Sequence, residues 1–135
     1  MNADFEQIQP GQSARATDRV TQAHIQAFAD VSGDTNPVHL DEDYAKATAF
    51  GGVIAHGMLS AAFISKVLGT QLPGHGAIYV EQSLRFRAPV RPGDEVVTDV
   101  EVIEVLHSKK RVRLRTTCSV EGRKVLDGEA LMLVP

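Results

Sequence analysis

Tryptophan is absent from this sequence of 135 residues, aromatic residues make up only 5% of it, and it holds a single cysteine. Without aromatic bulk, the core has to be built mainly from valine, leucine, isoleucine and alanine. One cysteine excludes an internal disulfide framework and indicates a reducing compartment. Cys118 stands in a strand-like run, so we expect a small buried residue rather than a reactive thiol.

An excess of either charge is also missing. The formal net charge is −3, from 14 basic and 17 acidic residues, which gives no global attraction to nucleic acid or to an anionic membrane. No apolar run approaches the ~20 residues that a membrane helix needs, and the first ten residues lack the features of a signal peptide. We therefore expect a soluble, cytoplasmic protein with one domain over residues 1–135.

The first half of the sequence predicts helices. Thr21 is a suitable N-cap for an amphipathic helix that ends at Gly33, and Asp41 is suited to cap a second, short helix. Residues 57–69 are apolar nearly all round, with Lys66 as the only charge. A helix of that kind belongs in the middle of a protein.

The second half predicts strands. Segments 77–90, 95–106, 111–120 and 124–135 are rich in β-branched residues and are separated by turn signals, and the first 17 residues form a lead-in with room for a short strand. This order indicates an α+β domain in which a curved antiparallel sheet wraps around the long apolar central helix. The other face of the sheet and its edges then need cover, which a homodimer would supply.

One polar stretch, SGDTNPVH at residues 32–39, gathers an acid, an amide, a proline and a histidine. On a regular helix, Asp34 and His39 would point about 140° apart. Pro37 disfavours a helix here, because it lacks an N–H donor and restricts the residue before it. We interpret the stretch as a bent connector that can aim Asp34 and His39 at one point, with Asn36 bonded to neighbouring backbone.

This element, with Val31 before it, resembles the signature of the MaoC-like, R-specific enoyl-CoA hydratases, as do the downstream segments AFGGVIAHGML and VRPGDEVVTDVEV. The resemblance implies a hot-dog fold, usually dimeric. It also implies an enzyme, a hydro-lyase that adds water to trans-2-enoyl-CoA and gives (R)-3-hydroxyacyl-CoA. By the same resemblance, Asp34 and His39 are the catalytic pair, and the backbone N–H of Gly57 binds the thioester oxygen.

These residue types suit that chemistry. A carboxylate and an imidazole around one water can act as general base and general acid, and which of Asp34 and His39 carries each proton stays open because the two titrate as a pair. Gly57 stands where the apolar helix begins, so unpaired N–H groups and the positive end of the helix dipole are available there. No cofactor is expected, since CoA is part of the substrate.

A metal site is the weaker interpretation. It would use His39, Asp41, Asp43 and His56, but the two acids read better as charges favoured at a helix N-terminus. We therefore expect no metal.

Further residues are candidates for substrate binding. Met58, Phe63 and Leu68 on the central helix and Met132 on the last strand could line an acyl slot, although a place in the core is the simpler interpretation for each. Arg85 and Arg87 could meet the CoA phosphates, with a solvated strand face as the alternative. Asn36 would support the bend, and His56 could shape the loop at Gly57.

Three other functions stay open: a 3-hydroxyacyl dehydratase acting on acyl carrier protein, a hot-dog thioesterase, and a non-catalytic acyl-CoA-binding subunit. For the hydratase, the family implies a link between fatty-acid β-oxidation and the supply of polyhydroxyalkanoate monomers. The expected partners are an acyl-CoA and a second copy of the chain, with neither nucleic acid nor membrane.

Overall fold

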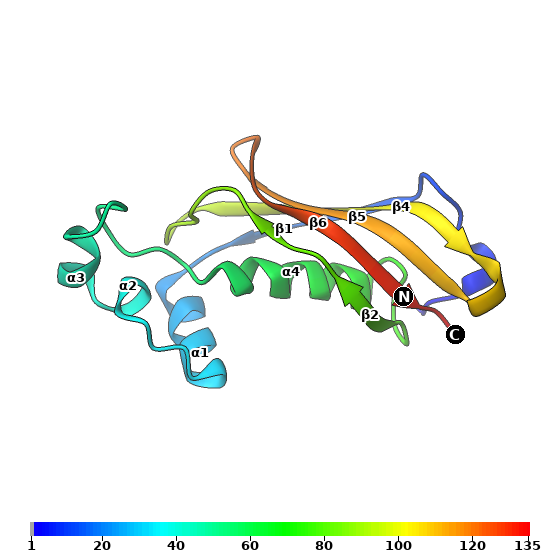
Figure 1. The fold of residues 1–135 in the computed structure, drawn as a ribbon, viewed down its shortest axis with the longest axis horizontal. Helices are drawn as coiled ribbons and strands as arrows, with labels where there is room; N and C mark the ends of the chain where they lie inside the picture. The colour runs from blue at the N-terminus through cyan, green and yellow to red at the C-terminus, as the bar shows by residue number, and fades with distance from the viewer. Residues whose placement is uncertain (1) are drawn as a thin grey trace.

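The computed structural model describes residues 2–135. Its strands form one antiparallel sheet in the order β1-β4-β5-β6-β2, and β3 pairs with β6. The sheet curves around α4, which lies along one of its faces (Figure 1). The strands are β1 (Ser13–Arg19), β2 (Ile78–Gln82), β3 (Arg85–Phe86), β4 (Glu95–Leu106), β5 (Arg111–Val120) and β6 (Arg123–Leu133). The predicted α+β fold is confirmed.

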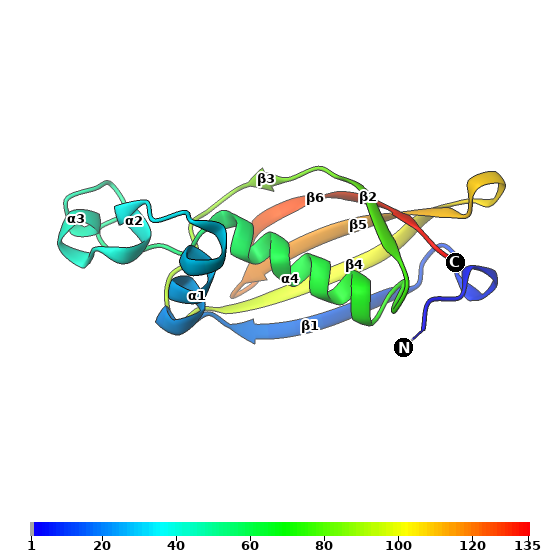
Figure 2. The ribbon, with the colours of Figure 1, turned by 90° about the horizontal axis from the view of Figure 1, so that it is seen from below.

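Four α-helices and two short 3-10 helices complete residues 2–135. Beside the first turns of α4 lies α1, while α2 and α3 project beyond the end of the sheet (Figure 2). No helix within residues 2–135 combines the length and the apolar character that crossing a membrane requires. The helices are η1 (Phe5–Gln7), α1 (Gln22–Ser32), α2 (Pro37–Leu40), α3 (Glu42–Lys46), α4 (Gly57–Thr70) and η2 (His107–Lys109).

The core lies between α4 and the inner face of the sheet. Along β4 and β5 every second residue is buried over most of the strand, because successive side chains of a strand point to opposite faces. The side chains that fill this space are almost all aliphatic, as the composition predicts. Those without any exposed surface include Val96 on β4, Val112 and Leu114 on β5, and Ile64, Val67 and Leu68 on α4.

The outer face of the sheet is polar, and this corrects one expectation. Ion pairs cross from strand to strand there: Arg15 to Asp99 at 2.6 Å and Arg115 to Glu101 at 3.0 Å, both between exposed side chains. Such a face is stable in water and needs no partner. At the edge strand β2, by contrast, Ile78, Tyr79 and Val80 are exposed apolar side chains.

The residues that the sequence predicts as helix caps are the ones that cap the helices. The Thr21 side chain accepts the His24 N–H at 3.1 Å and caps α1. Gly33 ends α1 with a φ of 77°, a conformation that glycine adopts without steric cost. Asp41 caps α3 by accepting the Tyr44 N–H at 3.0 Å.

Two expectations are wrong in detail. A helical turn, α2, begins at Pro37, where we expected none, because proline at the first helical position loses no hydrogen bond and has the right φ. The segment predicted as one strand over 77–90 is interrupted, giving β2 and the two-residue β3. Arg87 therefore lies beyond the end of β3.

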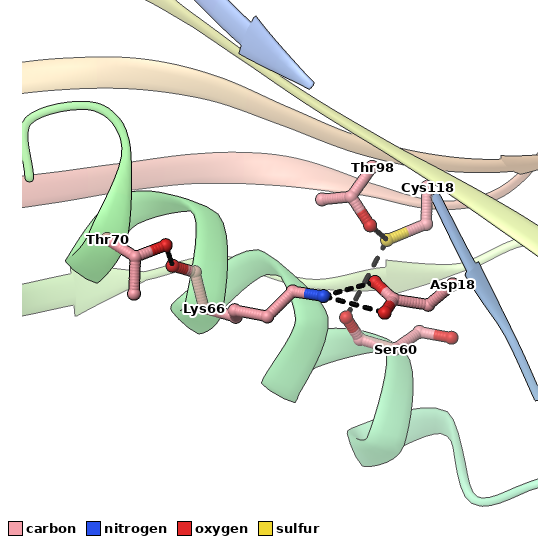
Figure 3. A network of polar contacts seen from close by, with 6 residues as sticks. All are labelled: Asp18, Ser60, Lys66, Thr70, Thr98 and Cys118. Atoms are coloured by element: carbon pink, nitrogen blue, oxygen red, sulfur yellow. Dashed lines mark hydrogen bonds and ion pairs between the residues drawn. The ribbon is translucent and has the colours of Figure 1, made fainter. Parts of the chain in front are cut away.

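Polar contacts fasten α4 to the sheet (Figure 3). The Lys66 ammonium donates to both carboxylate oxygens of Asp18 on β1, each at 2.6 Å. The Cys118 thiol of β5 donates to the Ser60 carbonyl at 3.6 Å and lies 3.5 Å from the Thr98 hydroxyl. Burial raises the pKa of Cys118 to about 11, so the thiol is a buried structural group, as predicted.

Candidate active site

The connector after α1 is shaped by side chains that bond to nearby backbone. The Asp34 N–H donates to the Ser32 hydroxyl at 3.0 Å, and the Asp34 carboxylate accepts the Asn36 N–H at 3.2 Å. Asn36 in turn caps α2 by accepting the Val38 N–H at 3.2 Å. These contacts, with Pro37 at the first helical position, fix the direction in which α2 starts.

His39 lies in α2 and is buried, with 8% of its surface exposed. Its Nδ1 lies 2.8 Å from the carbonyl oxygen of Ile54. A carbonyl only accepts, so Nδ1 carries the proton of this contact, and in the neutral ring Nε2 holds the free lone pair. The fold thus sets both the orientation and the tautomer of His39.

His56 directly precedes α4 and is more deeply buried, at 2% exposure. Its Nε2 lies 3.0 Å from the backbone carbonyl oxygen of Asp34, and its ring stacks on that of His39 with centroids 3.9 Å apart and planes at 30°. Phe28 of α1 packs nearby, at 4.8 Å. Within residues 2–135, the buried Nδ1 of His56 has no hydrogen-bond partner.

The structure brings the predicted pair together. One carboxylate oxygen of Asp34 and one ring nitrogen each of His39 and His56 all lie within 4.8 Å of one another. Asp34 is exposed, whereas both histidines are buried, so this carboxylate can meet solvent on one side and the histidines on the other. A water molecule between the groups would be within hydrogen-bonding reach of several of them.

These three groups are also of types that bind metals. The rings of His39 and His56 are stacked, with an angle of only 30° between their planes. The nitrogen lone pairs lie within these two ring planes, which run nearly parallel. A Zn²⁺ ion needs lone pairs that converge on it from about 2.0–2.1 Å, which stacked rings do not provide. Asp41, from the metal set considered above, is engaged as the cap of α3. The arrangement suits a hydrogen-bonded water better than a metal.

Gly57 is the first residue of α4 and is exposed. His56 at the N-cap provides no side-chain capping bond to residues 2–135, so the helix start keeps N–H groups for a ligand, with the helix dipole behind them. A Cβ built at Gly57 would come within 2.6 Å of the Phe86 ring. Glycine is therefore required for a close approach at this point.

A cavity of about 570 Å³ opens in front of the helix start. Its wall holds the predicted residues His39, His56, Gly57, Met58 and Arg87 together with a mainly apolar surround. Sequence reasoning missed most of that surround, because its members come from separate loops and strands. They include Phe50, Ile54, Phe86, Pro89, Val90 and Val125.

Other predicted substrate contacts lie elsewhere. Leu68 and Met132 are buried in the core and do not line this cavity, so the alternative interpretation as core residues describes their place. Phe63 packs partly buried against the core, beside His24. Arg85 is exposed on β3 and away from the cavity wall. Arg87, at the wall, forms an ion pair with Asp127 at 3.1 Å.

Comparison with known proteins agrees with this geometry. A family model described as MaoC like domain matches residues 4–126. An (R)-specific enoyl-CoA hydratase from Rhodospirillum rubrum is 56% identical over 131 residues, which are 97% of this chain and 91% of that protein.

Solved structures give the same result. The unliganded R-hydratase PhaJ1 from Pseudomonas aeruginosa superposes with a TM-score of 0.94 at 47% identity, over 99% of this chain and 86% of that one. The (R)-hydratase from Aeromonas caviae involved in PHA biosynthesis has a TM-score of 0.93 at 44% identity, over 96% and 99% of the two chains. The chain therefore belongs to the MaoC-like domain family and has a hot-dog fold.

Proposed function

We propose that this protein is an (R)-specific enoyl-CoA hydratase, which converts trans-2-enoyl-CoA to (R)-3-hydroxyacyl-CoA. The observation that carries the proposal is the convergence of Asp34 and His39 at the start of α4, beside an apolar cavity. The 56% identical relative from Rhodospirillum rubrum is an (R)-specific enoyl-CoA hydratase. Hydration of the enoyl thioester needs a water that is held in place for attack, a proton for C2, and stabilisation of the negative charge on the thioester oxygen.

Asp34 and His39 activate the water and transfer the proton. Asp34 and His39 hold the water and remove its proton as the oxygen attacks C3, and the proton that C2 receives passes through the same pair. The lone pair on His39 Nε2, free because Nδ1 donates to Ile54, is ready to accept a hydrogen bond from that water. No cofactor takes part.

The start of α4 stabilises the negative charge on the thioester oxygen. As water adds, charge builds on the thioester oxygen, and the Gly57 N–H donates to it with the helix dipole behind. The acyl chain enters the apolar cavity, whose volume of about 570 Å³ lies in the range of small-molecule sites. Of the two predicted cations, Arg87 lines the cavity and Arg85 does not, so Arg87 is the one proposed to meet the CoA phosphates.

We further propose that two copies pair through β2. Three adjacent large apolar side chains of this edge strand are exposed: Ile78 at 58%, and Tyr79 and Val80 at 38% each. An exposed apolar edge strand is an association site unless it is covered. A second copy would cover it and continue the sheet.

The proposed setting is the cytoplasm. There, (R)-3-hydroxyacyl-CoA made from β-oxidation intermediates would supply polyhydroxyalkanoate synthesis. The Aeromonas caviae relative is described as acting in PHA biosynthesis.

The reaction is tested with purified protein and crotonyl-CoA. A hydratase removes the enoyl thioester absorbance without releasing free thiol, and chiral chromatography of the product gives the R isomer. Release of thiol would instead indicate a thioesterase, and no change at all would indicate a binding subunit. A strong preference for the acyl-carrier-protein thioester would make the protein the corresponding dehydratase.

A further inference from the structure

His56 connects the parts of the site that come from different segments. Its Nε2–H donates to the backbone carbonyl of Asp34 at 3.0 Å, its ring covers that of His39 at 3.9 Å, and its own backbone leads directly into Gly57. One side chain thus contacts the acid segment and the imidazole, and it adjoins the proposed oxyanion donor.

One ring nitrogen of His56 adds nothing to the stability of the fold. The ring is 98% buried, and its Nδ1 has no hydrogen-bond partner within the described residues. An unpaired polar atom in the interior is a cost that an apolar side chain of similar size would avoid. Such costs persist where the polar group serves the site rather than the core.

Within residues 2–135, the side chain of His56 makes one hydrogen bond, and it links two distant segments. Asp34 is exposed, and its segment is otherwise held by bonds within the connector itself, to Ser32 and Asn36. The His56 bond is a link across 22 positions of sequence. It joins the carboxylate-bearing bend to the start of α4, and so relates Asp34 to Gly57.

We infer that His56 is a positioning residue that holds Asp34 and His39 in register with the Gly57 N–H. Its Nε2–H bond places the Asp34 backbone, and its ring face limits the rotation of the His39 ring. His56 acts through these residues and moves no proton itself. The inference rests on the proposed hydratase function and adds a residue role to it.

The test compares two substitutions of His56. Phenylalanine keeps the ring packing but removes the donor to Asp34, whereas glutamine can place an amide N–H near the position of Nε2. A displacement of about 1 Å at a reacting group costs on the order of 100-fold in rate. We therefore expect His56→Phe to lower kcat for crotonyl-CoA by ~10–100-fold with little change in KM, and His56→Gln to keep at least about tenfold more of kcat than phenylalanine does.

A stability-matched control separates positioning from a general loss of structure. Thr98 is also fully buried and polar, and it lies on β4 with its hydroxyl against Cys118. Thr98→Val removes the hydroxyl that contacts Cys118, so it should lower Tm without a comparable fall in kcat. Two results would overturn the inference: a His56→Phe enzyme with wild-type kcat, or a His56→Gln enzyme as slow as the phenylalanine variant.

The same data distinguish this inference from the function that it assumes. If the wild-type protein does not hydrate crotonyl-CoA or its acyl-carrier-protein counterpart, the proposed function fails. If the wild type is active and the two variants do not differ as described, only the role of His56 fails.

Discussion

At the scale of single residues, the absence of a Cβ at Gly57 is expected to matter for activity, and this can be tested. A methyl group there would meet the Phe86 ring at 2.6 Å. Phe86 is 54% exposed and can swing into solvent, so Gly57→Ala should fold. It should still crowd the thioester oxygen and lower kcat/KM by ~100–1,000-fold, as when an oxyanion donor is lost.

A second glycine of α4 provides the control for this measurement. A Cβ at Gly69 would meet nothing within 4 Å, so Gly69→Ala makes the same chemical change on the same helix and should leave activity intact while raising Tm slightly. If Gly57→Ala were as active as Gly69→Ala, the backbone at Gly57 would not bind the substrate oxygen.

Some residues of the site could be predicted from the sequence and others could not. Asp34 and His39 stand in one short motif and Gly57 in a second segment at the start of the apolar helix, so the nearness of these residues could be predicted. The linking role of His56 could not, because its partner Asp34 is 22 positions away and its stacking on His39 exists only in the folded chain. The exposed Phe86 gave no signal at all.

At the scale of elements, the one-turn helix α2 carries His39 and depends on its cap. Asn36→Ala removes the acceptor of the Val38 N–H and should lower the free energy of unfolding by about 1 kcal/mol. Because α2 orients His39, kcat should also fall several-fold, and Asn36→Asp should restore both. Urea unfolding and crotonyl-CoA turnover measure the two effects.

The cap of α1 provides a control that separates the loss of stability from the loss of turnover. Thr21 caps α1, a helix without either residue of the pair, so Thr21→Ala should cost a similar free energy but reduce kcat less than Asn36→Ala. Equal losses of kcat in the two variants would show that α2 has no special part in placing His39.

The elements themselves were mostly predictable, for physical reasons. Gly57–Thr70 is apolar nearly all round, with Lys66 as its only charge, so a central helix was expected, and the β-branched runs were expected to be strands. The helical turn at Pro37 was missed because the rule applied to proline concerned helix interiors, whereas Pro37 is the first residue of α2. The interruption between β2 and β3 depends on pairing with β6, which sequence does not reveal.

At the scale of the whole molecule, the apolar edge at β2 predicts a dimer. Light scattering after size exclusion should give about twice the chain mass of 14.6 kDa. Val80→Lys, which places a charge in the exposed apolar edge, should yield monomers. Thr17→Lys, on the opposite edge strand β1, should remain dimeric. A monomeric wild type, or a dimeric Val80→Lys variant, would contradict pairing through β2.

The outer face of the sheet needs no partner, because it is lined by ion pairs. Its ion pairs, such as Arg15 with Asp99, lie between exposed side chains and add little to stability individually, but they make the sheet face compatible with water. Charged residues on those strands are evident from sequence. Their arrangement in cross-strand pairs requires the register of β1, β4 and β5.

The central claim is that Asp34 and His39 act together on one water at the start of α4, and turnover of crotonyl-CoA by Asp34→Asn and His39→Gln tests it most directly. Asp34→Asn keeps the shape of the side chain, His39→Gln keeps a polar side chain of similar reach, and each change removes the ability to exchange a proton. We predict a fall in kcat of ~100–10,000-fold for each variant, with Tm close to that of the wild type. Turnover at the wild-type rate in either variant would contradict the account.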